Sequence, residues 1–109
     1  MSTTTNTLIA SVTSEQNPQS GQKHRSSGNF STEGLPEGTT TLLWKVEGGG
    51  DSNAIKFNVM QDKSAATDPV IFKGILSGNR TDAKSIRSLY IADPSGATSS
   101  FVVHVYAVN

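Results

Sequence analysis

The chain contains no cysteine among its 109 residues. Without cysteine it can form neither a disulfide framework nor a thiolate metal site. Cysteine usage therefore gives no argument for or against secretion. Net charge is absent as well, because nine basic residues balance nine acidic ones. A balanced chain lacks the broad positive field on which non-specific binding to nucleic acids and anionic membranes depends. We therefore expect no nucleic-acid partner and no membrane partner.

Long apolar runs are also missing from the sequence. No segment approaches the roughly 20 consecutive apolar residues that cross a bilayer as a helix. The start of the chain, Met1 to Gln16, has neither the basic beginning nor the apolar stretch of a signal peptide. These absences lead us to expect synthesis in the cytoplasm, without a signal peptide.

What the chain does have is uncharged polarity. Apolar residues make up 34% of it and charged residues 17%, so most of the polarity comes from Ser, Thr, Asn, Gln and Gly. Disordered segments usually combine low hydrophobicity with high net charge, and this chain has no net charge. Short runs of Val, Ile and Phe between polar connections are typical of β-strands, and the length suits one domain. The composition therefore indicates a single β domain with a small core.

Alternating hydrophobicity locates the strands. The clearest alternation runs from Leu42 to Met60, where glycine-rich residues separate two alternating runs, and we interpret this stretch as the central hairpin. Further strands are expected at residues 7–13, 70–76, 86–92 and 100–108, and we expect the last of these to lie centrally. About six short strands without a convincing helix predict an all-β fold, a small antiparallel β-sandwich or jelly-roll-like domain.

Two features of these strands predict burial. Trp44 shares one face of its strand with Leu42 and Val46, so we expect it in the core. The run at residues 70–76 is apolar on both faces apart from Lys73, which predicts that this strand is deeply covered.

A long polar segment from Ser14 to Gly34 has Phe30 as its one large apolar residue. Connections of this length are uncommon in compact domains unless they are functional or become ordered on a partner. We divide the chain into an N-terminal strand with an extended polar arm or loop, residues 1–34, and a β-sandwich core, residues 35–109, within one domain overall. Deletion of residues 1–34 is expected to spare the fold and to abolish assembly.

Two stretches supply the candidate interaction residues. In the arm, Lys23, His24 and Arg25 form the one basic cluster, and Phe30 follows it. Because interleaved aromatics are missing, the cluster is a weak nucleic-acid signal and is more typical of a solvated loop. At the tip of the central stretch, glycines are followed by acidic and amide side chains. The tip candidates are Gly48, Gly49, Gly50, Asp51 and Asn53.

The tip has two interpretations, a contact loop for a partner or glycan and a plain turn whose glycines adopt positive φ. Glu47 and Asp51 carry the oxygen ligands that calcium prefers, but their spacing is not that of a dedicated calcium loop. No residues have the spacing of a zinc site either. We therefore predict no metal and no cofactor.

The sequence contains few residues in the arrangements that catalytic sites require. The two histidines, His24 and His104, lie in the polar arm and the last strand, and no serine has nucleophile-elbow surroundings. His104 alternates with valines, which predicts a packed or half-exposed sheet residue. Tyr90 and Tyr106 are the better candidates for a surface platform on which a sugar ring could stack. We expect that the protein is not an enzyme.

Two functions stay open. The first is a non-enzymatic structural protein of a larger particle, a capsid decoration or cementing protein of a phage virion, in contact with protein neighbours as a homo-oligomer. The thin core and the long arm motivate it, because a small core limits how stable a domain can be alone. The alternative is a carbohydrate-binding, lectin-like β-sandwich module that holds a glycan on loops such as residues 48–53 and 77–82.

Overall fold

The computed structural model describes residues 5–15, 25–64 and 67–109, which form seven β-strands and one short 3₁₀ turn. The strands are β1 (Asn6–Thr13), β2 (Thr41–Gly48), β3 (Lys56–Gln61), β4 (Val70–Leu76), β5 (Arg80–Asp82), β6 (Leu89–Ser95) and β7 (Phe101–Val108), and the turn is η1 (Ser52–Ala54). The all-β prediction is therefore confirmed. No helix in the described part of the chain is long and apolar enough to cross a membrane.

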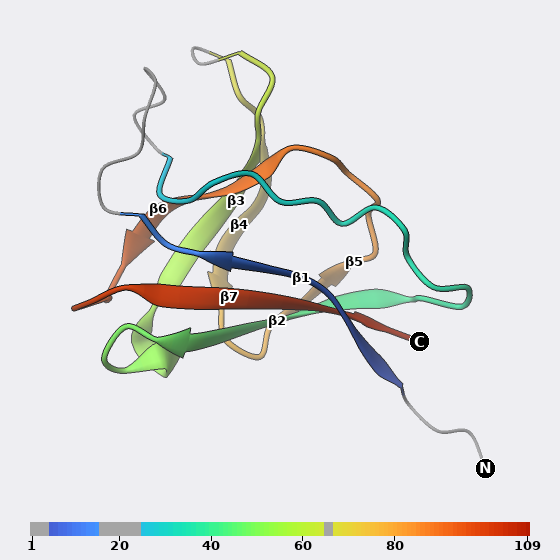
Figure 1. Cartoon of the computed structure of the whole chain (residues 1–109), viewed down its shortest axis with the longest axis horizontal. Coiled ribbons are helices and arrows are strands. Elements are labelled where there is room, and N and C mark those ends of the chain that lie inside the picture. The colour runs from blue at the N-terminus through green and yellow to red at the C-terminus, as the bar shows by residue number, and fades with distance from the viewer. Residues whose placement is uncertain (1–4, 16–24, 65–66) are drawn as a thin grey trace.

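The strands form two antiparallel sheets. The four-stranded sheet has the order β1-β7-β2-β5, and the three-stranded sheet has the order β4-β3-β6. Figure 1 shows β1, β7 and β2 side by side, with β3, β4 and β6 behind them running in a different direction. The sandwich prediction is confirmed, and β7 lies between β1 and β2, as its apolar sequence predicts.

The core between the sheets is built around Trp44, whose side chain is completely buried. Phe30, Phe57 and Phe72 meet its ring edge-on, with centroid distances of 6.2, 6.2 and 5.7 Å respectively. The indole N–H donates to Thr81 Oγ1 at 2.9 Å, which satisfies the one polar atom of the ring. The prediction that Trp44 belongs to the core is confirmed.

The prediction of a central hairpin from Leu42 to Met60 is wrong. β2 belongs to the four-stranded sheet and β3 to the three-stranded sheet, so the connection between them passes from one sheet to the other. Gly48, Gly49 and Gly50 all have positive φ, and η1 follows them, which makes this crossing possible. Strands that face each other across a core bury one face just as paired strands do. Hydrophobic alternation therefore does not distinguish a hairpin from this crossing.

β4 is less covered than its apolar run predicts. It is an edge strand in which Ile75 alone is fully buried, and Val70 is 49% exposed. Its pairing with β3 shifts register twice, and Gly74 has φ 68°, so the two faces are not kept apart along the strand. Two smaller boundaries also differ: the loop expected at residues 77–82 contains β5, and the strand expected at residues 86–92 runs from Leu89 to Ser95.

Residues 25–34, the described end of the predicted arm, pack along β6. Phe30 and Leu89 exchange backbone hydrogen bonds of 2.8 Å in both directions. Ser27 and Thr32 are completely buried, and the Phe30 ring lies against the core tryptophan. The expectation that the arm can be deleted without unfolding the protein does not fit this packing, because the deletion would remove buried side chains from the core.

Candidate interaction surface

One face of the four-stranded sheet lies on the core, and the other, the outer face, points away from it. Residues that lie opposite each other in register point to the same side of a sheet. Leu8 on β1 lies opposite Tyr106 on β7, and Tyr106 lies opposite Leu43 on β2. Leu8 is 52% exposed, Tyr106 is half-buried and Leu43 is nearly buried. We call Leu43, Tyr106 and Leu8 the apolar row, which crosses the sheet and ends at an exposed leucine.

A polar row lies beside the apolar row. Ser11 lies opposite His104, and His104 lies opposite Lys45. Ser11 Oγ is 2.7 Å from His104 Nδ1, whereas the His104 Nε2 atom is 3.9 Å from Glu47 Oε1. A hydroxyl, an imidazole and a carboxylate are the groups of a hydrolytic triad, but 3.9 Å is beyond hydrogen-bonding distance. His104 is half-buried on β7, which confirms its prediction as a sheet residue.

The two rows border a depression on the outer face. Its volume is about 580 Å³, and Tyr106 and Leu43 lie in its lining beside Asn6, Lys45 and Glu47. The lining thus combines an aromatic ring with an amide and side chains of both charges. Such a mixture suits a polar ligand with one apolar face, for which the ring offers a stacking surface.

β1 forms one edge of the four-stranded sheet. It pairs with β7, and no other strand of residues 5–15, 25–64 and 67–109 pairs with its second edge. Edge strands present backbone N–H and C=O groups that can bond to a strand of another chain. β1 has no charged side chain, whereas β4 contains Lys73, and β5 contains Arg80 and Asp82. β1 therefore lacks the charges that commonly protect an edge from pairing.

The outer face of the three-stranded sheet is covered. Tyr90 lies on it opposite Met60, and Tyr90 is 1% exposed. The Arg25 guanidinium lies 4.1 Å from the centroid of the Tyr90 ring and bonds to Asp62 Oδ2 at 2.8 Å. The Tyr90 hydroxyl donates to Asp68 Oδ2 at 2.6 Å. Residues from two connections therefore close this face over the tyrosine.

Burial has an electrostatic consequence for Tyr90. Loss of water around the hydroxyl, followed by its hydrogen bond to Asp68 and the negative charge of that carboxylate, raises the pKa of Tyr90 well above its ordinary value. The sequence-based prediction of Tyr90 as a surface platform is wrong, because residues 25–34 fold over β6 and bring Arg25 onto the ring. Tyr106, the other predicted platform residue, is partly exposed.

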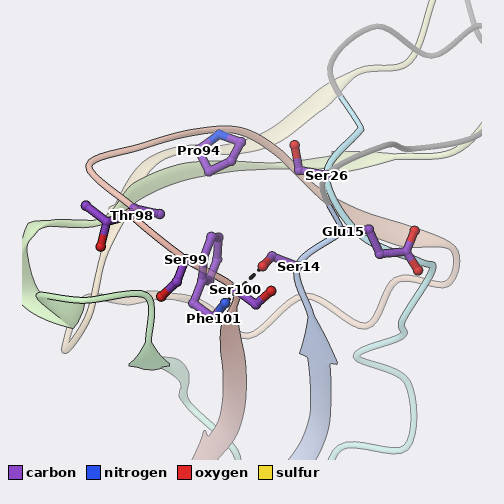
Figure 2. A pocket seen from close by; sticks show the side chains of 9 residues that line it. Ser14, Glu15, Ser26, Pro94, Thr98, Ser99, Ser100 and Phe101 are labelled. Carbon is purple, nitrogen blue, oxygen red and sulfur yellow. Dashed lines mark hydrogen bonds between the residues drawn. The ribbon is translucent and has the colours of Figure 1, made fainter.

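A second hollow, of about 440 Å³, lies where β1 ends and β7 begins (Figure 2). Ser14, Ser26 and Thr98 contribute hydroxyl groups to its lining. Ser14 Oγ accepts a hydrogen bond from the Phe101 backbone N–H at 2.9 Å, and the Thr98 hydroxyl donates to Gly49 O at 3.2 Å. The Ser14 hydroxyl therefore connects the end of β1 to the start of β7, and the Thr98 hydroxyl connects the β6–β7 loop to the β2–β3 crossing, which gives both a structural role.

The tip residues of the β2–β3 crossing differ in their accessibility. Gly49 is buried with φ 76°, and a Cβ built on it would meet the Ile55 side chain and the Phe101 Cβ, so a larger residue at this position would be strained. Asp51 accepts a hydrogen bond from the Asn53 backbone N–H at 3.1 Å, which caps η1. The exposed tip candidates are Gly48, Gly50, Asp51 and Asn53.

The arm candidates are not brought together with the tip by any contact of the described residues. Lys23 and His24 lie outside the described residues. Arg25 is engaged with Asp62 and with an aromatic ring, and Phe30 is packed in the core. The contacts of Arg25 and Phe30 are therefore made within the chain, where both side chains stabilise the sandwich.

No group of three or more His, Asp or Glu side chains in the described ranges could hold a metal ion. The chain matches no protein-family model, no curated protein and no solved structure. The candidate surface therefore rests on geometry alone. It consists of the apolar row, the polar row beside it and the open edge of β1.

Sequence reasoning identified Tyr106 as a platform residue but not the apolar row around it. The alternation of β7 places His104 and Tyr106 on one face. Which residues lie beside them on β1 and β2 depends on register, and a shift of one residue would place Leu8 on the core side instead. Register is set by pairing between distant segments, for which a single sequence carries no direct signal.

Proposed function

We propose that the protein is a non-enzymatic structural subunit that assembles with protein neighbours in a larger particle. The observation that carries this proposal is the edge of β1, which is uncharged and ends an apolar row at a half-exposed leucine. Addition of a strand to such an edge supplies backbone hydrogen bonds and needs no ligand pocket. The surface therefore suits a protein neighbour better than a small substrate.

The particle that we propose is a phage virion, in which the chain would be a capsid decoration or cementing protein. Support for this choice comes from the low apolar fraction of 34% and the long polar segment before β2. A small domain that occupies repeated sites on a shell gains stability from its neighbours by mass action.

The assembly function is tested by the mass of the protein in its native source. A tagged full-length chain is recovered under mild conditions, and its mass is measured beside electron microscopy of the same fraction. We expect it to elute with a particle much larger than the 11.5 kDa monomer. Recovery as a free monomer of 11.5 kDa would contradict the proposal.

A carbohydrate-binding function is the second candidate, because Tyr106 lies in a depression lined by Asn6, Lys45 and Glu47. The ring could stack on the apolar face of a sugar while the polar groups bond to its hydroxyls. A glycan array probed with the wild-type chain and with Tyr106→Ala tests this function. Binding that is lost in Tyr106→Ala would support it, and silence across a broad array would count against it.

A further inference from the structure

The apolar row is cut off at the edge of its sheet. Leu43 and Tyr106 each have an apolar neighbour in the next strand, but Leu8 lies on the last strand and is 52% exposed. We propose that a second copy of this chain pairs antiparallel with β1 about a two-fold axis near Leu8. This inference rests on the proposed assembly function. It identifies the partner as a second copy of the chain and the contact as β1 paired with β1, which we call the seam.

Two-fold symmetry would complete the row. In an antiparallel pair of identical strands centred on Leu8, the two Leu8 side chains lie directly opposite each other on the outer face, about 4.5 to 5.5 Å apart at Cβ. The row of one copy then continues into the row of the other, with Leu43 at both ends. The two four-stranded sheets become one continuous sheet, and the exposed leucines are covered.

Charge favours this edge over β4. β1 carries no charge, and the nearest charged side chain of the polar row, Lys45, lies two strands away on β2. Across the dimer the two Lys45 positions are five strand spacings apart, about 24 Å. This exceeds the Debye length of about 8 Å, so their repulsion is screened. Pairing of two β4 edges would instead bring Lys73 of both copies into the seam.

The same edge limits the strength of the pair. The register of β1 with β7 shifts between Leu8 and Ala10, and a bulge at this place twists the edge. The seam is therefore short, and it belongs to the weak class of interfaces, in the micromolar range. Repeated copies held in a particle would strengthen it through their high effective concentration.

Lysine substitutions test the seam against a matched control. Leu8 and Val70 are 52% and 49% exposed, and each lies on an edge strand, so Leu8→Lys and Val70→Lys perturb the folded monomer similarly. Sedimentation velocity from micromolar to millimolar concentration gives the dissociation constant of each chain. We expect the wild type and Val70→Lys to dimerise equally, and Leu8→Lys to dimerise about tenfold more weakly or worse.

The absence of cysteine allows a second test of the register. Leu8→Cys and Val70→Cys each introduce a single thiol. In the proposed pair the two Cβ atoms at position 8 lie about 4.5 to 5.5 Å apart, so a shift of about 1 Å between the strands brings the thiols to the roughly 3.5 to 4.5 Å spacing of a disulfide. We expect Leu8→Cys to form a covalent dimer at a concentration where Val70→Cys stays monomeric. Equal cross-linking of the two variants would overturn the proposed seam.

The outcomes separate this inference from the assembly function. A wild-type chain that is monomeric at every concentration, yet elutes with a native particle, would overturn self-pairing and leave assembly standing. A dimer that is sensitive to Val70→Lys and not to Leu8→Lys would overturn the choice of edge. A chain that is monomeric both alone and in its native source would overturn both proposals.

Discussion

Tyr90 and Tyr106 lie on the outer faces of the two sheets, but their surroundings are opposite. Tyr90 is sealed beneath Arg25 and bonded to Asp68, whereas Tyr106 is half-buried in an open row. The difference comes from the polar segment before β2, whose residues 25–34 cover the three-stranded sheet. One sheet thus has its outer tyrosine inside the fold, and in the described part of the chain the other has a partly exposed outer tyrosine and an unpaired edge at β1.

Sealing a face with charged residues requires that each charge be compensated. The Arg25 side chain is only 10% exposed, and it meets a carboxylate at 2.8 Å and the face of an aromatic ring. An uncompensated charge at that depth would be destabilising. On the open face, water supplies the compensation, so the polar row beside Tyr106 needs no such network. The covered face is therefore closed by contacts within the chain, and among the described residues the outer face of the four-stranded sheet has no comparable cover.

Among the changes that test this comparison, removal of residues 1–34 is expected to have the largest effect on the stability of the fold. The deletion takes away β1 together with Phe30 and Arg25, so it opens the core and uncovers Tyr90 at once. We expect an unfolded chain, visible as loss of the β signal in far-ultraviolet circular dichroism. A chain that lacks only residues 1–5 keeps β1 and serves as the folded control. Cooperative unfolding of the shorter chain would contradict the assignment of residues 25–34 to the core.

Alanine at the two tyrosines compares the faces directly. Tyr90→Ala removes a buried ring, so we expect a loss of about 3 to 5 kcal/mol in the free energy of unfolding. Tyr106→Ala removes a partly exposed ring, and we expect a loss below about 1 kcal/mol. Urea denaturation measures both values. Similar losses at the two positions would show that the outer faces are not covered differently.

Two arginine–carboxylate pairs, Arg25–Asp62 and Arg87–Glu33, allow a buried ion pair on the covered face to be compared with an exposed one. The Arg25 side chain is 10% exposed and the Arg87 side chain is 78% exposed, with their carboxylate partners at 2.8 and 3.3 Å. We expect Arg25→Ala to lower the free energy of unfolding by about 1 to 3 kcal/mol. Arg87→Ala is the matched surface control, with an expected change within about 0.5 kcal/mol. Equal changes in urea denaturation would mean that Arg25 does not seal the face.

Alkaline pH should weaken the covered face. Because the pKa of Tyr90 is raised in the folded protein, the unfolded chain releases this proton first as the pH rises above about 10. The stabilising contribution is thus fully present below about pH 10 and is lost above it, by up to about 1.4 kcal/mol per pH unit. Unfolding measured between about pH 9 and 12 in the wild type and Tyr90→Phe checks this. An unchanged slope in Tyr90→Phe would contradict it.

The strands and the core were largely predictable from the sequence, because alternation reports burial locally. Trp44, Leu42 and Val46 alternate toward the core as predicted, and β7 lies centrally as its apolar sequence indicates. Pairing was not predictable in the same way. The β2–β3 crossing has the alternation of a hairpin, and the two are distinguished only by strand pairing, because β2 pairs with β5 and β7 whereas β3 pairs with β4 and β6.

The candidate surface was harder to predict than the core. From the sequence, Arg25 is expected to be a solvated arm residue, because its partner Asp62 and the Tyr90 ring that it contacts are distant in sequence. Leu8 has no local feature that separates it from Val12 on the same strand, although Val12 is buried and Leu8 is exposed. The bulge between Leu8 and Ala10 changes the side to which residues point, and a sequence pattern does not show where it occurs.

Hydroxyl-radical footprinting of the isolated and the assembled protein tests most directly whether assembly uses β1 and the outer face of the four-stranded sheet. Leu8 and Tyr106 report on that surface, Val70 reports on the β4 edge of the three-stranded sheet, and Tyr90 reports on the covered face. We expect the labelling of Leu8 and Tyr106 to fall on assembly, with Val70 unchanged and Tyr90 weakly labelled in both states. Protection of Val70 with Leu8 and Tyr106 still labelled would contradict this assignment.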